Sequence, residues 1–314
     1  FKTLVLRGEN NQSWGRYSKK GTSMADQVLR DVQEEMSGFQ SHGTHVHLFL
    51  NGLYWGLYNL CEYGDSDFAA GIWGGEDVDW DVIKHDDGSP EDKEDGVERL
   101  DVRDGSAEDF MAFVDDLKAK AKDGTLSADE FRAVSEKIDI DAFIDYYILE
   151  CYIGNQDWPE NNWVAMMSTK LDQPLRYLAW DLEYALEDRT QEDLSKDSGY
   201  DYTADNLHLA LVKIPEYRLR FADRVHKHFY NNGALTEESL KARYSARADL
   251  IGKMIFAESA RWGAYYYDHS KNGLGTWLSA NGINISKNFS CLNPSHEDHN
   301  PSMSFDAKRN RCHC

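Results

Sequence analysis

The stretch NQDWPENNW, at residues 155–163, gathers acidic and amide side chains around one proline and two tryptophans. Asp157 stands five positions before Asn162, and the later segment AWDLEYALED brings Asp181 and Glu183. Carboxylate and amide oxygens suit hard cations such as Mg²⁺, which takes few carboxylates together with phosphate oxygens. One interpretation is therefore a site that holds metal ions against a phosphate. The other is an ordered turn, built from Asx turns and the proline, with the later aspartate capping a helix.

The spacing D-x-x-x-x-N also occurs in the catalytic loop of protein kinases, where the aspartate receives the substrate proton and the asparagine holds a metal ion. Asp181, which follows a predicted strand pair, takes the place of the metal-binding aspartate of the D-F-G motif. Because Glu183 is two residues farther on, an extended backbone would put both side chains on one face. A loop bearing Asp157 and Asn162, followed by strands that end at Asp181, could aim three oxygen ligands at one point.

The flanking segments predict the elements that would hold these residues. The apolar run DIDAFIDYYILECYIGN predicts a helix that leads into residues 155–163. NNWVAMM and PLRYLAWDLEYAL predict two short strands joined by a turn around 169–174. Ser127 and Glu130 predict a capping box at the start of an earlier helix. Helical patterns also cover SAEDFMAFVDDLKAKAK, IPEYRLRFADRVHKHFYNNG and LTEESLKARYSARADLIGKMIFAESARWG.

The first third of the chain predicts strands and one helix. FKTLVLRG is typical of a short strand, and residues 22–36 carry apolar residues at helical spacing. Asn51 and the glycine after it separate two β-rich runs, which predicts a hairpin with a type I′ turn. His45 and His47 share a face of the first run and could bind metal, but without a third ligand nearby we predict exposed strand residues. Residues 84–105 are acidic and rich in turn formers, so they predict a loop, and they do not meet the EF-hand pattern.

The composition fits a globular chain. Of its 314 residues, 41% are hydrophobic and 12% aromatic, which is enough for a full core. The 34 basic and 55 acidic residues give a net charge of −21, which disfavours binding to nucleic acid or to an anionic membrane. No apolar run approaches the roughly 20 residues of a membrane-spanning helix. Cys61 and Cys151 stand far apart, which predicts buried thiols and no disulfide framework.

Several motifs, taken in order, resemble the CotH protein-kinase family, which is named for a spore-coat component. They are THVHLFLNGLYWGLYNLCEYGDSDF, ECYIGNQDWPENNW, YLAWDLEYAL, YRLRFADRVHKHFYNNGALT and ESARWG, and the likeness runs over residues 1–268. The chain is similar to the branch that contains N-x-D-W-x-x-N-N and W-D-x-E. The resemblance implies an α+β, atypical protein-kinase-like bilobal fold. It has a small β-rich N-lobe at about 1–62 and a larger helical C-lobe at about 63–268.

The resemblance also implies a reaction, the transfer of phosphate from ATP with Mg²⁺ or Mn²⁺. By motif match, Asp157 is expected to be the catalytic aspartate, Asn162 a metal ligand and Asp181 the main metal-binding aspartate. Glu183 matches an acidic position of the family's W-D-x-D/E motif and is expected to hold a second ion. Kinase-like folds also transfer AMP, so the group transferred stays open.

Three further residues match family positions near the nucleotide. Arg7 and Arg30 both match recurring basic positions that could grip the phosphates, and we prefer Arg7 because it ends a strand beside a glycine. Glu62 matches a position after the hairpin, as the partner of that base or near the nucleotide. A structural salt bridge is the alternative for each of them. No intact glycine-rich phosphate loop is visible, and we expect the N-lobe to be incomplete at its N-terminus.

As an enzyme, the chain is expected to phosphorylate Ser or Thr of a protein substrate, a surface or secreted protein. The resemblance alone implies an extracellular or cell-surface location in bacteria. The alternative is a kinase-shaped module without turnover that uses an acidic cleft to bind cations or a partner. Retention of Asp157, Asn162 and Asp181 favours the enzyme, whereas the absent glycine loop keeps the binding module open.

The last segment, residues 269–314, differs in character from the rest. It has five basic and three acidic residues, whereas the preceding residues carry a net charge of −23. CLNPSHEDHNPSMSFDAKRNRCHC is similar to the zinc-binding domain at the N-terminus of bacterial and phage primases, which implies Zn²⁺ bound by Cys291, His296 and Cys314, with one ligand missing. Cys312 is a poorer fourth ligand. This segment is either a truncated zinc finger, joined by a chimeric reading frame or an assembly join, or a mostly disordered tail without function, and we favour the disordered tail.

Overall fold

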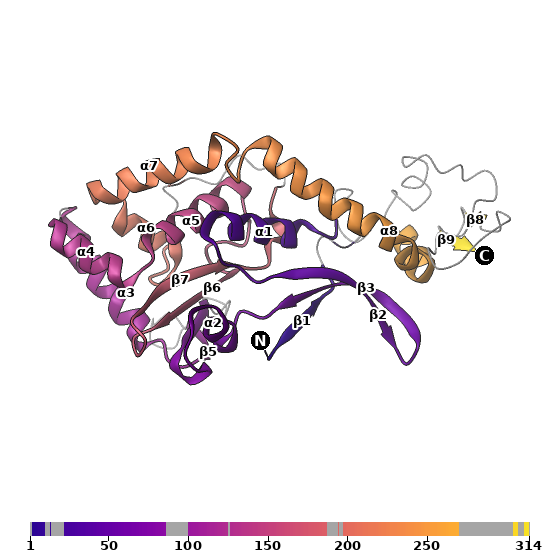
Figure 1. The fold of residues 1–314 in the computed structure, drawn as a ribbon, viewed down its shortest axis with the longest axis horizontal. Coiled ribbons are helices and arrows are strands. Elements are labelled where there is room, and N and C mark those ends of the chain that lie inside the picture. The colour runs from indigo at the N-terminus through magenta and orange to yellow at the C-terminus, as the bar shows by residue number, and fades with distance from the viewer. Residues whose placement is uncertain are drawn as a thin grey trace. The chain divides into compact units, whose positions relative to one another are not determined.

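The structure, a computed structural model, describes residues 2–9, 13, 22–85, 100–124, 126–186, 194, 197–269, 304–306 and 311–313. Helices and small β-sheets are mixed along the chain, as Figure 1 shows, which confirms the predicted α+β class. The chain divides into two compact units. The first comprises Phe1–Leu4, Leu29–His42 and Glu62–Leu240, and the second comprises Val5–Val28, Gly43–Cys61 and Lys241–Cys314.

The sheet of the first unit has the strand order β5-β4-β6-β7, and each strand runs antiparallel to its neighbours. Its strands are β4 (Asp81–His85), β5 (Leu100–Asp104), β6 (Trp163–Ser168) and β7 (Gln173–Ala179). The predicted pair of strands after residue 162 is confirmed, and every residue of β6 is buried. The prediction of a loop over 84–105 is wrong at both ends, because apolar residues anchor β4 and β5 in the sheet; residues 86–99 lie outside the described chain.

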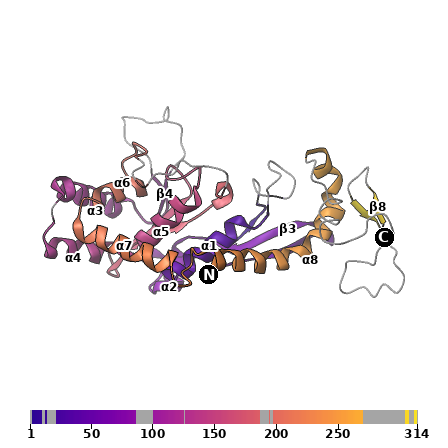
Figure 2. The same ribbon diagram turned by 90° about the horizontal axis from the view of Figure 1, so that it is seen from above.

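Helices cover this sheet. They are α2 (Ser66–Trp73), α3 (Glu108–Lys120), α4 (Ala128–Lys137), α5 (Ile140–Ile153), α6 (Ala204–Leu211) and α7 (Pro215–Phe229), with short 3-10 turns η1 (Asp77–Asp79), η4 (Ala121–Asp123) and η5 (Leu182–Tyr184). α5 packs on β7, α6 and α7 and is buried on nearly every side, as its apolar sequence requires (Figure 1). α3, α4 and α6 gather at one end of the unit (Figure 2). The capping box of Ser127 and Glu130 is confirmed at the start of α4.

A buried charge cluster ties α5 to α7. Asp145 on α5 is fully buried and accepts hydrogen bonds from two nitrogens of Arg224 on α7. His228, one turn farther along α7, places Nε2 2.7 Å from the same carboxylate. Because a buried carboxylate needs such partners, this cluster fixes how the two helices pack.

The second unit contains a hairpin of β2 (Gly43–Leu50) and β3 (Leu53–Glu62), with β1 (Leu4–Arg7) on the other side of β3. Asn51 and Gly52 have φ values of 51° and 78°, so the predicted type I′ turn is confirmed. His47 is exposed as predicted. The prediction for His45 is wrong, because its ring is buried and its Nε2 donates to the backbone oxygen of Ser23 at 2.7 Å.

Two long helices complete the described chain. α1 (Ala25–Ser37) confirms the helix predicted over 22–36, and its residues from Leu29 onward belong to the first unit. α8 (Glu237–His269) belongs to the second unit from Lys241 onward. Among the helices of the described ranges, none is long and apolar enough to cross a membrane.

The cysteines separate into two groups. Cys61 is buried, as predicted, whereas Cys151 is only partly buried, so the prediction of a buried thiol is wrong for Cys151. The predicted zinc ligands Cys291, His296 and Cys314 lie outside the described residues. In the described part of this segment, β8 (Ser304–Asp306) pairs antiparallel with β9 (Arg311–His313).

Candidate functional site

A polar cavity of about 270 Å³ lies within the first unit, at the ends of β6 and β7 that carry the predicted site residues. Its lining combines two carboxylates, two amides, two cations and two indoles: Lys84, Arg103, Asp157, Asn161, Asn162, Trp163, Trp180 and Asp181. The structure therefore brings together Asp157, Asn162 and Asp181, three of the four residues that the D-x-x-x-x-N and W-D-x-E motifs single out.

The loop that bears Asp157 is anchored by its tryptophans. Trp158 is fully buried, and its Nε1 donates to the hydroxyl of Tyr146 on α5 at 2.7 Å. Trp163 is also buried, and its Nε1 donates to the backbone oxygen of Pro159 at 2.9 Å. Because both buried indoles anchor the loop, the exposed side chain of Asp157, which lines the cavity, has rigid neighbours. The tryptophans of this stretch thus anchor the loop, and Trp163 also lines the cavity together with Asp157, Asn161 and Asn162.

Asn162 and Asp181 are joined directly. The Asn162 Nδ2 donates to the backbone oxygen of Asp181 at 3.2 Å, and the backbone nitrogen of Trp180 donates to the backbone oxygen of Asn162 at 3.1 Å. Since Nδ2 makes this bond, Oδ1 is the amide atom that can coordinate a cation. Both residues have a left-handed backbone, with φ values of 67° and 58°. Asn and Asp tolerate this region better than other residues with side chains, and such positions concentrate at functional sites.

Glu183 does not accompany Asp181 into the cavity. The left-handed turn at Asp181 leads into the 3-10 turn η5, so the segment is not extended, and the prediction that both side chains share a face is wrong. Glu183 is buried, and it does not belong to the lining of the cavity. Asp181 stands at the N-cap position of η5, but its side chain makes no capping hydrogen bond to the described backbone. The helix-cap interpretation of Asp181 therefore does not account for its carboxylate.

Lys84 and Arg103 are the two cationic residues of the cavity that the sequence analysis did not single out. They lie on the adjacent strands β4 and β5, inside the segment that was predicted to be a loop. Arg103 is held in place, since its guanidinium donates to the backbone oxygen of Gly64 at 2.8 Å and lies 4.4 Å from the ring centroid of Tyr63. Burial lowers the pKa of Arg103 from its ordinary value, although it stays a cation at neutral pH. Lys84 is 3.6 Å from a carboxylate oxygen of Asp101.

The other predicted residues lie apart from this lining. Arg30 is fully buried, donates to both the backbone oxygen and the hydroxyl of Ser41, and lies 5.3 Å from the ring centroid of Trp180. Arg30 therefore does not line the cavity but contacts the ring of Trp180, which does. Glu62 accepts hydrogen bonds from the backbone nitrogen of His42 and contacts its ring Nδ1, both at 2.9 Å.

Arg7, in the second unit, is paired with the buried carboxylate of Asp26 on α1 at 3.3 Å. This is the strand-to-helix salt bridge that was the alternative to a nucleotide contact. An ion pair of this kind also fits a base that is held in place for a ligand, so the structure leaves both interpretations of Arg7 open.

The donor set of the cavity suits a hard divalent cation. Asp157, Asn162 and Asp181 supply oxygen atoms only, and two carboxylates leave coordination positions for phosphate and water, which is the usual arrangement for Mg²⁺. Nowhere in the described ranges do three or more His, Cys, Asp or Glu side chains form a group that could hold a metal ion by themselves. The residues present therefore fit a cation that is shared with a phosphate, and they do not form an all-protein cage.

The comparisons with known proteins agree with this geometry in one respect. No curated protein matches the chain. The family described as CotH kinase protein matches residues 8–283, which include every residue of the cavity and extend beyond the predicted domain boundary at 268. Because this match covers most of the 314 residues, the chain belongs to the CotH kinase family.

Proposed function

We propose that the chain transfers the γ-phosphoryl group of ATP to a Ser or Thr hydroxyl of a protein, with Mg²⁺ or Mn²⁺ as the metal. The observation that carries this proposal is that Asp157, Asn162 and Asp181 line one cavity together with the cationic side chains of Lys84 and Arg103. Membership of the CotH kinase family supports a kinase-like reaction.

Asp157 takes the role of general base. Its carboxylate is exposed in the cavity, where an acceptor hydroxyl could reach it. As the hydroxyl oxygen forms a bond to the γ-phosphorus, its proton passes to Asp157, and the bond between the γ-phosphorus and the bridging oxygen breaks. ADP leaves with the electron pair of that bond, and the transferred group stays on the acceptor as a phosphate ester.

Asn162 and Asp181 hold the metal in this scheme. The Oδ1 atom of Asn162 and the carboxylate of Asp181 are the proposed ligands, and the hydrogen bond between the two residues fixes their spacing. When bound, the divalent cation supplies neutralisation of the charge on the β- and γ-phosphates. The left-handed backbone at both residues keeps their side chains pointed at the cavity before any ligand arrives.

Lys84 and Arg103 bind phosphate oxygens. The net charge of the chain is −21, so a polyanionic nucleotide needs a local cationic surface to approach the two aspartates. Arg103 presents a planar guanidinium that is already oriented by Gly64 and Tyr63, which lowers the entropy lost on binding. We place the acceptor protein, with the enzyme, at the cell surface or outside the cell.

Label transfer from ATP tests the proposal. The full chain is incubated with γ-labelled or α-labelled ATP, a mixture of secreted proteins as acceptors, and Mg²⁺ or Mn²⁺, alongside Asp181→Ala. Transfer from the γ position alone, lost in the variant, supports the proposal. Transfer from the α position would replace it with AMP transfer by the same residues. No transfer, together with no change in melting temperature on adding ATP and metal, would leave a module that binds other partners and contradict the proposal.

A further inference from the structure

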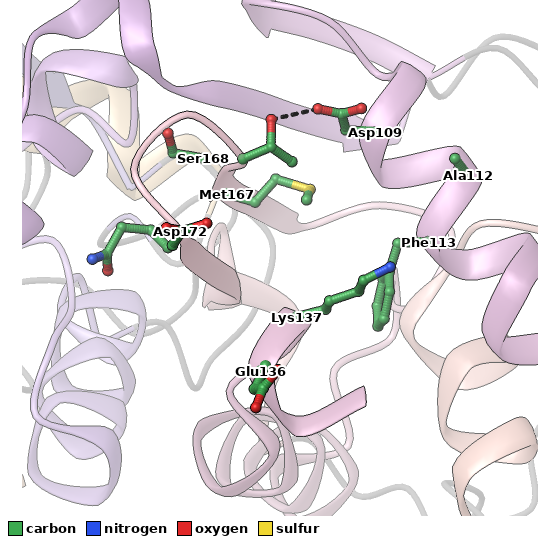
Figure 3. Close-up of a pocket in the computed structure, with 10 residues that line it drawn as sticks. Asp109, Ala112, Phe113, Glu136, Lys137, Met167, Ser168 and Asp172 are labelled. Atoms are coloured by element: carbon green, nitrogen blue, oxygen red, sulfur yellow. Dashed lines mark hydrogen bonds between the residues drawn. The ribbon is translucent and has the colours of Figure 1, made fainter. Parts of the chain in front are cut away.

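A larger cavity lies at the opposite end of the β6–β7 hairpin from the candidate site. It has a volume of about 610 Å³ and is framed by α3, the end of α4 and the turn between β6 and β7 (Figure 3). This volume is within the range of small-molecule sites. None of the residues assigned to phosphoryl transfer lines it, so it is a separate feature of the first unit.

The floor of this cavity is apolar. Phe113 on α3 and Met167 on β6 are each 4% exposed, and Ala112 adds a methyl group at the side. Apolar surface that is concave and open to solvent gains free energy when a ligand with a hydrocarbon body covers it. An aromatic ring in the floor also attracts a cation placed over its face.

The rim of this cavity is acidic. Asp109, Glu136 and Asp172 come from three different elements, and Lys137 is the one cation among the lining residues. Asp109 is oriented by the hydroxyl of Thr169, which donates to its carboxylate at 2.6 Å. Burial raises the pKa of nearby Asp81, and the charge of Asp109 raises it further, while a hydrogen bond from the Ser106 backbone and the charge of Lys170 lower it.

The end of α4 adds to the negative charge of the rim. Glu136 and Lys137 are the last two residues of the helix, so its C-terminus lies at the cavity. The final carbonyl groups of a helix carry partial negative charge and favour cations. Lys137 neutralises part of the negative charge of the rim, but the three carboxylates still outnumber it.

A metal ion is a poor match for this arrangement. In the described part of the chain, the acidic residues do not converge into a group of three that could chelate an ion. A ligand with separated positive charges on an apolar stem satisfies both the floor and the rim. We propose that this cavity binds an organic cation, namely primary ammonium groups carried on a hydrocarbon chain, as in a linear polyamine or a lysine side chain.

Isothermal titration calorimetry at low ionic strength tests this proposal with the full chain and no nucleotide. The probes are 1,6-diaminohexane, spermidine and, as the uncharged match, 1,6-hexanediol. A short peptide with one central lysine distinguishes a protein source from a free polyamine. We expect the diamine to bind and the diol to bind at least tenfold more weakly, because the diol keeps the hydrocarbon stem and lacks the charge.

Two kinds of variant localise the binding. Asp109→Asn with Glu136→Gln should weaken diamine binding at least tenfold, whereas the control pair Asp129→Asn with Asp223→Asn, which removes two exposed acids elsewhere, should change it less than twofold. Ala112→Trp keeps every carboxylate but fills the cavity, and it should also weaken binding at least tenfold. Equal affinity in the wild type and both cavity variants would overturn the proposal and assign the binding to the acidic surface as a whole. Diol binding as tight as diamine binding would overturn it as well.

Discussion

Gln33 of α1 bonds the outer edge of β7 with both ends of its side-chain amide. Its Nε2 donates to the backbone oxygen of Tyr177 at 2.7 Å, and its Oε1 accepts from the backbone nitrogen of Ala179 at 2.9 Å. Gln40 adds a bond from its Nε2 to the backbone oxygen of Ala179 at 3.2 Å. β7 is the last strand of its sheet, so these amides satisfy backbone groups that a neighbouring strand would otherwise pair.

This relationship bears on the candidate site, because the residue after Ala179 is Trp180 and the next is Asp181. One face of Trp180 meets the buried guanidinium of Arg30, which comes from the same helix as Gln33. α1 therefore sets the end of β7 from which the proposed metal ligand projects. Arg30 and Gln33 are positioning residues in this account, since they act through the backbone and through Trp180.

Gln33→Leu removes both bonds at nearly constant volume and should lower phosphoryl transfer by raising the Mg²⁺ concentration that is needed for half-maximal rate. The buried backbone groups of Tyr177 and Ala179 lose their partners, which costs about 2–4 kcal/mol of the free energy of unfolding. Rates at a series of Mg²⁺ concentrations, with chemical denaturation alongside, measure both effects. Glu35→Gln, at an exposed position of the same helix, is the control. An unchanged Mg²⁺ requirement in Gln33→Leu would remove the positioning role and leave only a structural one.

Lys84→Gln and Arg103→Gln should each reduce kcat/KM for ATP by roughly tenfold or more, since a charge-assisted hydrogen bond to phosphate contributes about 1.5–3 kcal/mol. Steady-state rates at several ATP concentrations measure the change. Lys118→Gln removes a lysine that pairs with Asp201 on the surface and should leave kcat/KM within twofold. If all three variants behaved alike, the two strand residues would have no place in nucleotide binding.

Asp145→Ala should destabilise the first unit by about 3–5 kcal/mol, because it leaves the charge of Arg224 and the buried ring of His228 without their carboxylate. Asp141→Ala is the matched control on the same helix. Its side chain is 50% exposed and pairs with Arg220 at 3.3 Å, so we expect a change within about 1 kcal/mol. Urea denaturation of the three proteins gives the comparison, and equal losses in both variants would show that the buried cluster has no special weight.

His208 makes stability depend on pH. Burial lowers its pKa from 6.5 to about 4, and its ring stacks on Tyr147 while Nδ1 contacts the hydroxyl of Tyr217. Between these two values the unfolded chain binds a proton that the folded chain does not bind, so the stabilisation present above pH 6.5 is lost as the pH falls toward 4. The loss attributable to this group is about 3 kcal/mol.

His208→Gln should therefore show a shallower fall in the free energy of unfolding between pH 6.5 and 4 than the wild type. Carboxylate protonation destabilises both proteins, so the difference between their pH profiles isolates the histidine. Denaturant titrations at half-unit steps of pH provide the profiles. Parallel profiles would show that His208 titrates in the folded chain as it does in the unfolded one.

The parts of the fold with a strong local signal could be predicted from the sequence. The Asn51-Gly52 turn, the Ser127–Glu130 capping box and the apolar helix before Asp157 each depend on neighbouring residues alone. The convergence of Asp157 and Asn162 with Asp181 could be predicted too, because it follows from one helix, one loop and one strand pair in order.

The remaining site residues depend on tertiary contacts that no local pattern carries. Lys84 and Arg103 enter the cavity because β4 and β5 pair across an acidic segment whose composition predicts only turns. Glu183 does not line the cavity because Asp181 has a left-handed backbone. An aspartate tolerates this conformation, but the sequence does not predict it. The buried ring of His45 donates a hydrogen bond to the backbone oxygen of Ser23, and this contact comes from a segment distant in the sequence.

The central claim is that Asp157 and Asp181 perform phosphoryl transfer in one cavity, and γ-label transfer by matched aspartate variants tests it most directly. Asp157→Asn, Asp181→Asn and Asp172→Asn each remove one carboxylate charge at constant size, and the last lies in the β6–β7 turn outside that cavity. We predict that the first two lose at least a hundredfold in rate at saturating ATP and Mg²⁺, while Asp172→Asn stays within threefold of the wild type. Equal rates in Asp181→Asn and Asp172→Asn would contradict the account.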